Sequence, residues 1–132
     1  DLGINLESGV AGDYPGISEY EAQEKLGAGP AVFLHDSSML PNLKLRDLVS
    51  KTAAESNIPL QYNVLSGYGE DGAEMQKSEG GTPVINITVP TRYLHSHNSL
   101  IDYRDVENAI DLVSRLVQKL DQETVSEISK FD

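Results

Sequence analysis

One run of β-branched residues constrains what this chain can fold into more than any other feature. It lies between a glycine pair, Gly80-Gly81, and Pro90, and its apolar members are Val84, Ile85, Ile87 and Val89. A short apolar run bounded by turn residues is typical of a strand buried on both faces in the middle of a sheet. Because proline donates no ladder hydrogen bond, we expect this strand, Pro83–Val89, to end at Pro90.

Side chains capable of chemistry follow this strand directly: Arg92, Tyr93, His95 and His97. In an open α/β sheet, ligand sites lie just beyond the carboxyl ends of the strands. Residues two apart on an extended chain point the same way, so both imidazoles could reach one metal ion. Loop histidines near a surface more often contact water or make local hydrogen bonds, and the spacing alone favours that interpretation.

The rest of the chain alternates between strands and helices. The first sixteen residues have the pattern of a strand that enters a loop, and Pro30–Ser37 and Leu60–Ser66 are expected strands. Helices are expected after Pro41 to about Ser56, at Asp71–Ser78, at Tyr103–Leu120 with Asp102 as its N-cap, and in the tail to Asp132. This order predicts an α/β fold of three layers, a mostly parallel sheet flanked by helices.

Apolar residues at helical spacing mark the faces that these helices should bury. In the helix after Pro41 they are Leu45, Leu48, Val49, Thr52 and Ala53. In the last long helix they are Val106, Ala109, Ile110, Val113, Leu116, Val117 and Leu120.

Composition excludes several classes of partner. The chain has 132 residues, the length of one domain or part of one, and 39% of its residues are hydrophobic, which is enough for a core. A net charge of −11 argues against nucleic acid and anionic membranes as partners. No apolar run reaches the length of a membrane span, and the start has no signal-peptide pattern, so we expect a cytoplasmic location. Without cysteine, the chain forms neither disulfides nor a thiolate metal site.

Four segments in the same order resemble one enzyme family. PTRYLHSH (Pro90–His97) is similar to the PTRYIHS segment of the glutamyl, deblocking or tetrahedral aminopeptidases, which use two metal ions. VAGDYPGISE (Val10–Glu19) is similar to their AGDxPG turn, and KLGAGPAVFLHDSS (Lys25–Ser38) to their LGxGPAI–MD strand. GYGEDGAEM (Gly67–Met75) occupies the place of their Gly-rich GGTDAG loop. From Asp13 to the histidines the family pattern fits this chain without a gap.

The resemblance implies a metal-dependent aminopeptidase that acts on peptides and forms homo-oligomers. The cofactors would be two divalent ions, Zn or Co, to which imidazole and carboxylate are ordinary ligands. His95 stands where the family places a ligand of one ion, whereas His97 has no counterpart there. Asp1 would be the carboxylate ligand of the second ion, provided that about six extra residues separate it from Asp13.

Other residues have a functional and a structural interpretation. Glu70, Asp71, Arg92 and Tyr93 are candidates for binding substrate, and Glu70 replaces a Thr of the family loop. Alternatively, Asp71 is the N-cap of a short helix, and Arg92 and Tyr93 contact His95 and orient it without binding substrate themselves. We expect Asp13 to be an Asx-turn residue, and His35 and Asp36 to be structural.

The family's remaining motifs are missing from this chain. Its His-x-Asp motif, its bridging Asp and its Glu-Glu pair, whose first Glu is the general base, precede the matching part. We therefore expect no catalytic residue in residues 1–132, which correspond to the C-terminal portion of the catalytic domain, without the N-terminal half and the inserted dimerisation domain. Alone, this portion should be inactive. The alternatives are a non-catalytic binding or assembly module that kept the fold, or a relative named as a cellulase or endoglucanase.

Overall fold

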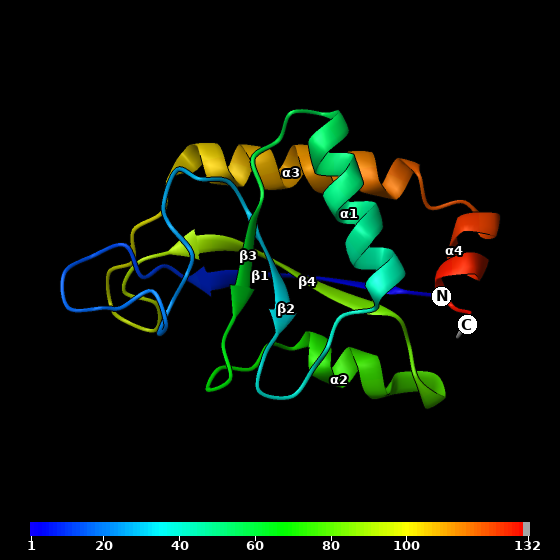
Figure 1. Cartoon of the computed structure of the whole chain (residues 1–132), viewed down its shortest axis with the longest axis horizontal. Helices are drawn as coiled ribbons and strands as arrows, with labels where there is room; N and C mark the ends of the chain where they lie inside the picture. Colours follow the sequence, from blue (N-terminus) through cyan, green and yellow to red (C-terminus); the bar gives the residue numbers. More distant parts are fainter. Residues whose placement is uncertain (131–132) are drawn as a thin grey trace.

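The computed structural model describes residues 1–130, which form one four-stranded sheet with helices on both faces (Figure 1). The elements in chain order are β1 (Gly3–Val10), β2 (Ala31–His35), α1 (Leu43–Glu55), β3 (Gln61–Val64), α2 (Gly72–Lys77), a 3-10 turn (Ser78–Gly80), β4 (Val84–Thr91), α3 (Tyr103–Gln118) and α4 (Gln122–Ile128). The tail is helical in α4, as expected. The end of the predicted tail, residues 131 and 132, lies outside the described part.

The sheet has the strand order β1-β4-β2-β3. β1 is parallel to β4 and β2 is parallel to β3, whereas β2 and β4 are antiparallel. Helices α1 and α3 lie on one face and α2 lies on the other (Figure 1). The predicted α/β fold, three layers around a mostly parallel sheet, is therefore confirmed.

β4 is the central strand, but it does not end at Pro90 as the sequence predicts. It continues through Thr91, and Pro90 stands opposite Gly9 in the register with β1. The carbonyl of Thr91 accepts a hydrogen bond from the backbone N–H of Ala11 at 3.1 Å, so Thr91 faces β1 and Pro90 faces the other side. On that side the pairing with β2 ends at Thr88. Pro90 therefore has no strand opposite it that would need a backbone N–H, and the sheet tolerates the proline.

The main core lies between the sheet and the helices α1, α3 and α4. Ile85 and Ile87 of β4 pack there against Leu45 and Val49 of α1 and Leu112 of α3. The predicted buried face of α1 is confirmed at four positions: Leu45, Val49, Thr52 and Ala53 are buried. Its Leu48 packs at the margin of the same core.

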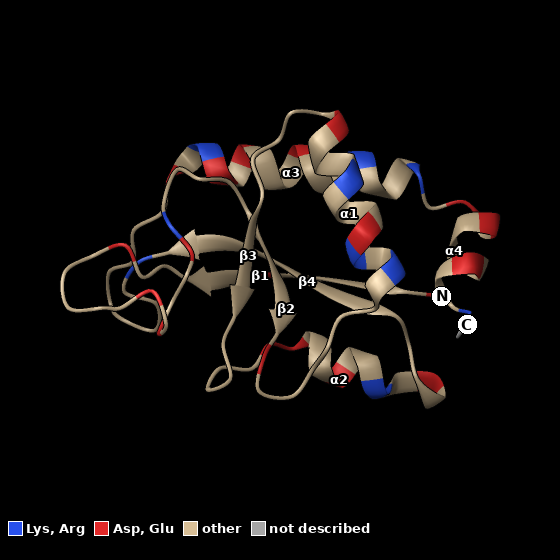
Figure 2. Ribbon diagram, in the orientation of Figure 1, with Lys and Arg blue, Asp and Glu red and all other residues tan. Residues whose placement is uncertain are grey.

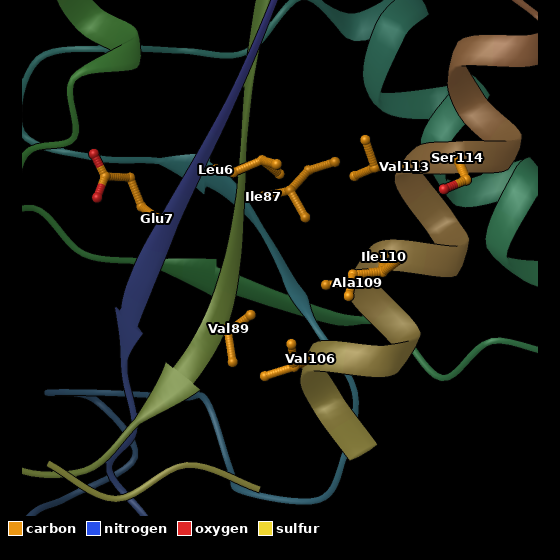
Figure 3. Close-up of a pocket in the computed structure, with 9 residues that line it drawn as sticks. All are labelled: Leu6, Glu7, Ile87, Val89, Val106, Ala109, Ile110, Val113 and Ser114. Carbon is orange, nitrogen blue, oxygen red and sulfur yellow. The ribbon is translucent and has the colours of Figure 1, made fainter. Parts of the chain in front are cut away.

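The buried stripe of α3 is rotated from the predicted one. Ile110 and Val117 are 61% and 56% exposed, while Leu112 and the carboxylate of Asp105 are fully buried. Ile110 instead lines an apolar groove between α3 and β1, which also includes Leu6 (Figure 3). Within residues 1–130, β1 is an edge strand, so no strand covers the groove beyond it.

Charged residues are concentrated on the helices and connecting loops, whereas the strands carry few (Figure 2). Among the described residues, no helix has both the length and the apolar character needed to span a membrane.

Candidate metal and substrate site

The loop that follows β4 carries the two candidate histidines. Arg92 and Leu100 exchange backbone hydrogen bonds of 2.9 and 3.2 Å and so close residues 93–99 into a loop. Tyr93 and His95 both have a φ of +61°, the left-handed region that residues with a Cβ rarely adopt. His95 and His97 are exposed but do not lie on extended chain, so the premise that their side chains point the same way is wrong. Such strained backbone tends to occur at functional sites.

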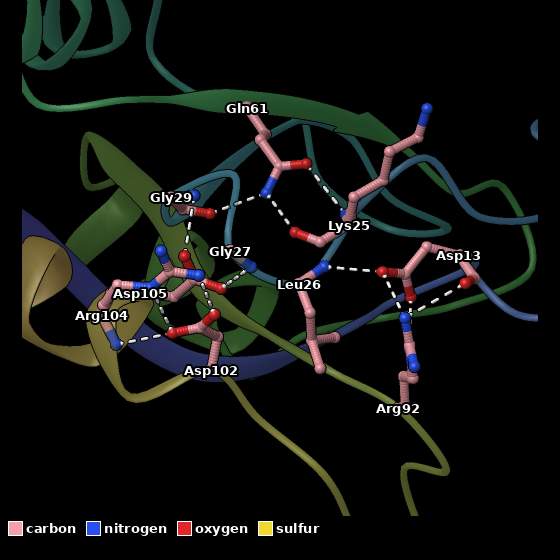
Figure 4. A network of polar contacts seen from close by, with 10 residues as sticks. All are labelled: Asp13, Lys25, Leu26, Gly27, Gly29, Gln61, Arg92, Asp102, Arg104 and Asp105. Atoms are coloured by element: carbon pink, nitrogen blue, oxygen red, sulfur yellow. Dashed lines mark hydrogen bonds and ion pairs between the residues drawn. The ribbon is translucent and has the colours of Figure 1, made fainter.

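Arg92 anchors this loop to the turn that contains Asp13 (Figure 4). Its Nε donates to Asp13 Oδ1 at 2.7 Å, and one Nη donates to Oδ2 at 2.8 Å. Asp13 also accepts a hydrogen bond from the backbone N–H of Leu26 at 3.0 Å. The Arg92 side chain holds the pKa of Asp13 below its ordinary value of 3.8. Asp13 is therefore an ion-pair partner that joins distant loops, not the local Asx-turn residue that the sequence predicts.

Tyr68, in the loop after β3, connects His95 to the body of the domain. Its ring is stacked with Phe33 on β2 at a centroid distance of 6.3 Å and with His95 at 6.4 Å. Burial, followed by the negative charges of Glu70, Glu7 and Glu24, raises the pKa of the Tyr68 hydroxyl to about 12. The phenol therefore keeps its proton at neutral pH, within electrostatic reach of these carboxyl groups.

Glu7 and Glu24 lie on the face of the sheet opposite α3. The side chain of Glu7 points away from α3, while Leu6 and Ile87 line the groove beside that helix (Figure 3). Glu24 is fully buried and accepts hydrogen bonds from Asn63 Nδ2 at 2.7 Å and Thr88 Oγ1 at 2.9 Å. Its other oxygen has no hydrogen-bond partner within residues 1–130. Burial is the main cause that raises its pKa to about 7.

The glycine-rich loop places Glu70 inside the protein and Asp71 at the surface. Glu70 is 7% exposed, and burial, followed by the charge of Glu7, raises its pKa to about 8. Its Oε1 finds no hydrogen-bond donor in the described part of the chain. Asp71 precedes α2 at the N-cap position, but in residues 1–130 its side chain makes no capping hydrogen bond. Asp71 therefore occupies the expected N-cap position, but its side chain does not cap the helix.

Asp36 holds this loop in place. One carboxylate oxygen accepts from the backbone N–H groups of Ser38 and Met39, both at 2.7 Å. The other accepts from the N–H of Glu70 at 3.2 Å and from Asn86 Nδ2 at 3.3 Å. Asp36 thus has the structural role that the sequence suggests.

The structure does not bring Asp1 and His95 together. Asp1 precedes the start of β1, where Gly3 pairs with Val84, whereas His95 follows the far end of β4. The seven register steps from Val84 to Thr91 span about 23 Å at 3.3 Å per residue. Metal ions that share a two-metal site lie only about 3.5–4 Å apart, so these two side chains cannot serve the same centre. This separation corrects the predicted pair.

Glu7 is the carboxylate on β1 that sequence reasoning missed. It pairs with Thr88, three positions before the end of β4, and its charge acts on Tyr68, which contacts His95. The alternation Ile4-Asn5-Leu6-Glu7 contained the signal, because it puts Glu7 on the face opposite Leu6. The donor types near Tyr68, imidazole and carboxylate, suit a divalent metal ion. Within residues 1–130, however, no three His, Asp or Glu side chains are grouped closely enough to hold one, so this chain fits only part of a metal centre.

Comparison with known proteins identifies the family. Residues 1–112 match the family described as M42 glutamyl aminopeptidase. The chain belongs to this M42 family. The TET aminopeptidase from a marine sediment archaeon, Thaumarchaeota archaeon SCGC AB-539-E09, is 43% identical, with a TM-score of 0.95 over 98% of this chain and 36% of that structure. The lysyl aminopeptidase of Pyrococcus furiosus is 33% identical over 89% of this chain and 34% of its own length. The glutamyl aminopeptidase of Lactococcus lactis is 28% identical over 81% of this chain and 30% of its own length.

Two facts about this chain follow from these M42 relatives. It spans about a third of their length. Its superposition on the archaeal structure covers 98% of its residues, and β1 pairs with β4 without interruption from Gly3 to Val10. The insertion expected between Asp1 and Asp13 is therefore wrong, because the strand β1 occupies that stretch.

Proposed function

We propose that this chain forms the C-terminal portion of the catalytic domain of a metallo-aminopeptidase that removes residues from the N-termini of peptides. Its membership of the M42 family supports this proposal, and so does the position of His95 just beyond the carboxyl end of the central strand. The general base and the remaining metal ligands would lie in the part of the relatives that this chain does not cover.

The metal centre would hold two divalent ions, Zn or Co, and His95 would be a ligand of one of them. The carboxylate from this chain would be Glu7 rather than Asp1, because Glu7 lies on the same side of the sheet as Tyr68 and within its electrostatic reach. When bound, such ions act as Lewis acids and lower the pKa of water. The described residues hold the His95 loop in place through the Arg92–Asp13 ion pair and the Tyr68 ring.

The substrate would be a peptide whose first residue lies near Glu70 and Asp71. Tyr93 is half-exposed and packs on Tyr14 at a centroid distance of 5.2 Å, so it is available to line this site. Arg92 would hold the loop of the site in place rather than bind substrate, because its guanidinium already donates to Asp13. Both a lysyl and a glutamyl aminopeptidase are among the relatives, so family membership leaves the preferred side chain open.

The full-length protein would act as a homo-oligomer in the cytoplasm. One similar structure, PhTET1-12s, is described as a dodecamer and is 25% identical with a TM-score of 0.74. The apolar groove beside β1 offers surface for contacts with further protein.

Endoglucanase activity is the second candidate. A Thermotoga maritima structure described as an endoglucanase is 29% identical, with a TM-score of 0.68. Glycoside hydrolysis requires two carboxyl groups that face the sugar from opposite sides. Glu24 and Glu70 are buried, and Glu24 is bound to Asn63 and Thr88, so they are poor candidates for such a pair. A non-catalytic module with this fold would bind no metal through His95.

The deciding experiment compares the metal content of the full-length protein with that of two variants. His95→Ala should lose most of the metal from one site and with it the hydrolysis of aminoacyl-nitroanilides. His97→Ala is the matched control, because His97 is an exposed imidazole on the same loop, and it should retain both. Equal metal content in the wild type and in His95→Ala, by elemental analysis, would reject the role of His95. Hydrolysis of cellulose without peptidase activity would favour the second candidate.

A further inference from the structure

Three rings from separate parts of the chain form a continuous stack. Phe33 on β2 is almost fully buried and contacts the ring of Tyr68 at a centroid distance of 6.3 Å with an interplanar angle of 23°. Tyr68 is also stacked with the imidazole of His95, at a centroid distance of 6.4 Å and an interplanar angle of 28°. Both distances fall in the range of favourable aromatic contacts. The stack therefore connects the exposed His95 to the interior of the domain.

The orientation of the His95 imidazole matters for metal binding. Metal-binding histidines usually donate their second ring N–H to a carboxylate or a carbonyl, which fixes the ring plane. Within the described residues, no hydrogen bond to either ring nitrogen of His95 occurs, and the contact with Tyr68 is its one aromatic interaction. The backbone of His95 is in the left-handed region, a conformation that persists only where the surrounding structure holds it.

We propose that Tyr68 is a positioning residue for His95: its ring, seated on Phe33, sets the plane in which the imidazole meets the metal ion. This inference rests on the proposed function, since it takes His95 to be a ligand. When Glu70 and Asp71 are laid on the Thr and Asp of the GGTDAG pattern, Tyr68 falls on a glycine. The ring is thus an addition of this chain to that pattern.

The test measures how Co(II) binds to the full-length protein and to variants at position 68. Tyr68→Phe keeps the ring and removes the hydroxyl, whereas Tyr68→Leu and Tyr68→Met replace the ring by aliphatic side chains. Tyr20→Leu is the matched control, because Tyr20 is 96% exposed. Two readouts are used: the Co(II) dissociation constant from competition with a chelator, and the visible absorption spectrum of the Co(II) form, which reports ligand geometry.

If the ring positions the imidazole, Tyr68→Phe should bind Co(II) within about twofold of the wild type, and both aliphatic variants should bind it roughly 10- to 100-fold more weakly, with an altered spectrum. Tyr20→Leu should match the wild type. The choice of Met as well as Leu keeps the test decisive if one of them does not fold. An unchanged spectrum and affinity in a folded aliphatic variant would overturn the inference, and so would a Phe variant as impaired as the aliphatic ones.

Failure of the proposed function gives a different result. If His95→Ala retains all its metal, His95 is not a ligand, whatever Tyr68 does. The stack itself is measured separately in the metal-free protein, as the ring-current shift of the His95 imidazole protons in NMR spectra. That shift should be present in the wild type and in Tyr68→Phe and absent in Tyr68→Leu. Its absence from the wild type would overturn the inference while leaving the metal role of His95 standing.

Discussion

Asp13 and Arg92, which are 79 positions apart in the chain, form a two-point ion pair that ties the turn after β1 to the loop after β4. Both loops leave the carboxyl ends of neighbouring parallel strands, so they emerge at the same edge of the sheet. The planar guanidinium matches the two carboxylate oxygens, a geometry that a lysine could not reproduce. The pair therefore fixes where the loop with His95 begins.

Breaking this pair should destabilise the fold in a pH-dependent way. The pKa of Asp13 is lowered by its hydrogen bonds to the Arg92 side chain, so its stabilising contribution is present above its ordinary pKa of 3.8 and lost as the pH falls through the lower folded-state value. Asp13→Asn should lower the melting temperature by several degrees at pH 7, and the difference from wild type should shrink under acid conditions. Asp47→Asn is a suitable control, since the ion pair of Asp47 with Arg46 is at the surface. A constant difference at every pH would contradict this mechanism.

Glu24 should give the opposite pH dependence. Burial raises its pKa from 4.5 to about 7, so the folded state holds this proton more tightly than the unfolded state. The stabilisation is complete below pH 4.5 and is lost as the pH rises through about 7. The shift corresponds to about 3 kcal/mol in the free energy of unfolding, an order-of-magnitude value.

Glu24→Gln separates the charge from the shape of this side chain. The amide oxygen can still accept from Asn63 and Thr88, and its size suits the space beside Gly9, where an added Cβ would lie 2.1 Å from Glu24 Oε2. The variant should lose the pH dependence and be more stable than wild type at pH 8. Denaturant unfolding at pH 5 and pH 8 measures both effects. Parallel changes in the two proteins would show that Glu24 does not titrate in this range.

Patterns local to the sequence predict the fold well, because β4 and α1 are each defined by the spacing of their own apolar residues. The rotated stripe of α3 shows where this reasoning stops: Ile110 fits the helical pattern but faces the groove beside the edge strand β1. The site is harder to predict, because its contacts join segments far apart in sequence. Glu24 lies in a polar stretch with no local sign of burial, and its surroundings come from β3 and β4.

The 132-residue chain by itself should bind zinc only weakly. A tetrahedral site needs three or four protein ligands, and residues 1–130 contain no group of three suitable side chains. Titration calorimetry of this chain should show no stoichiometric, tight binding of Zn²⁺, and His95→Ala should behave like the wild type. Tight binding of one equivalent of zinc would contradict the view that this chain holds part of a centre.

The exposed apolar groove should also promote association of the chain with itself, which Ile110→Lys should reduce in sedimentation experiments.

Substrate preference is the last prediction, and we expect it to depend on Glu70. Its carboxyl group is buried near Glu7, and its pKa is raised to about 8, so it is mostly protonated at neutral pH. A positive charge on the substrate would favour its ionised form, whereas a second carboxylate would keep it protonated. Once ionised, Glu70 and a cationic side chain of the substrate would interact by roughly 4 kcal/mol at close range and an effective dielectric constant of ~20, before desolvation.

A net difference of about 1.4 kcal/mol already changes kcat/KM tenfold. The full-length enzyme should therefore cleave Lys, Arg or neutral N-terminal residues faster than Glu or Asp. The measurement compares lysyl- and glutamyl-nitroanilide with wild type and Glu70→Thr, the residue that the family pattern has at this position, with Glu74→Thr on the exposed side of α2 as the control. Faster turnover of Glu than of Lys by the wild type would reject this role for Glu70, and so would an unchanged ratio in Glu70→Thr.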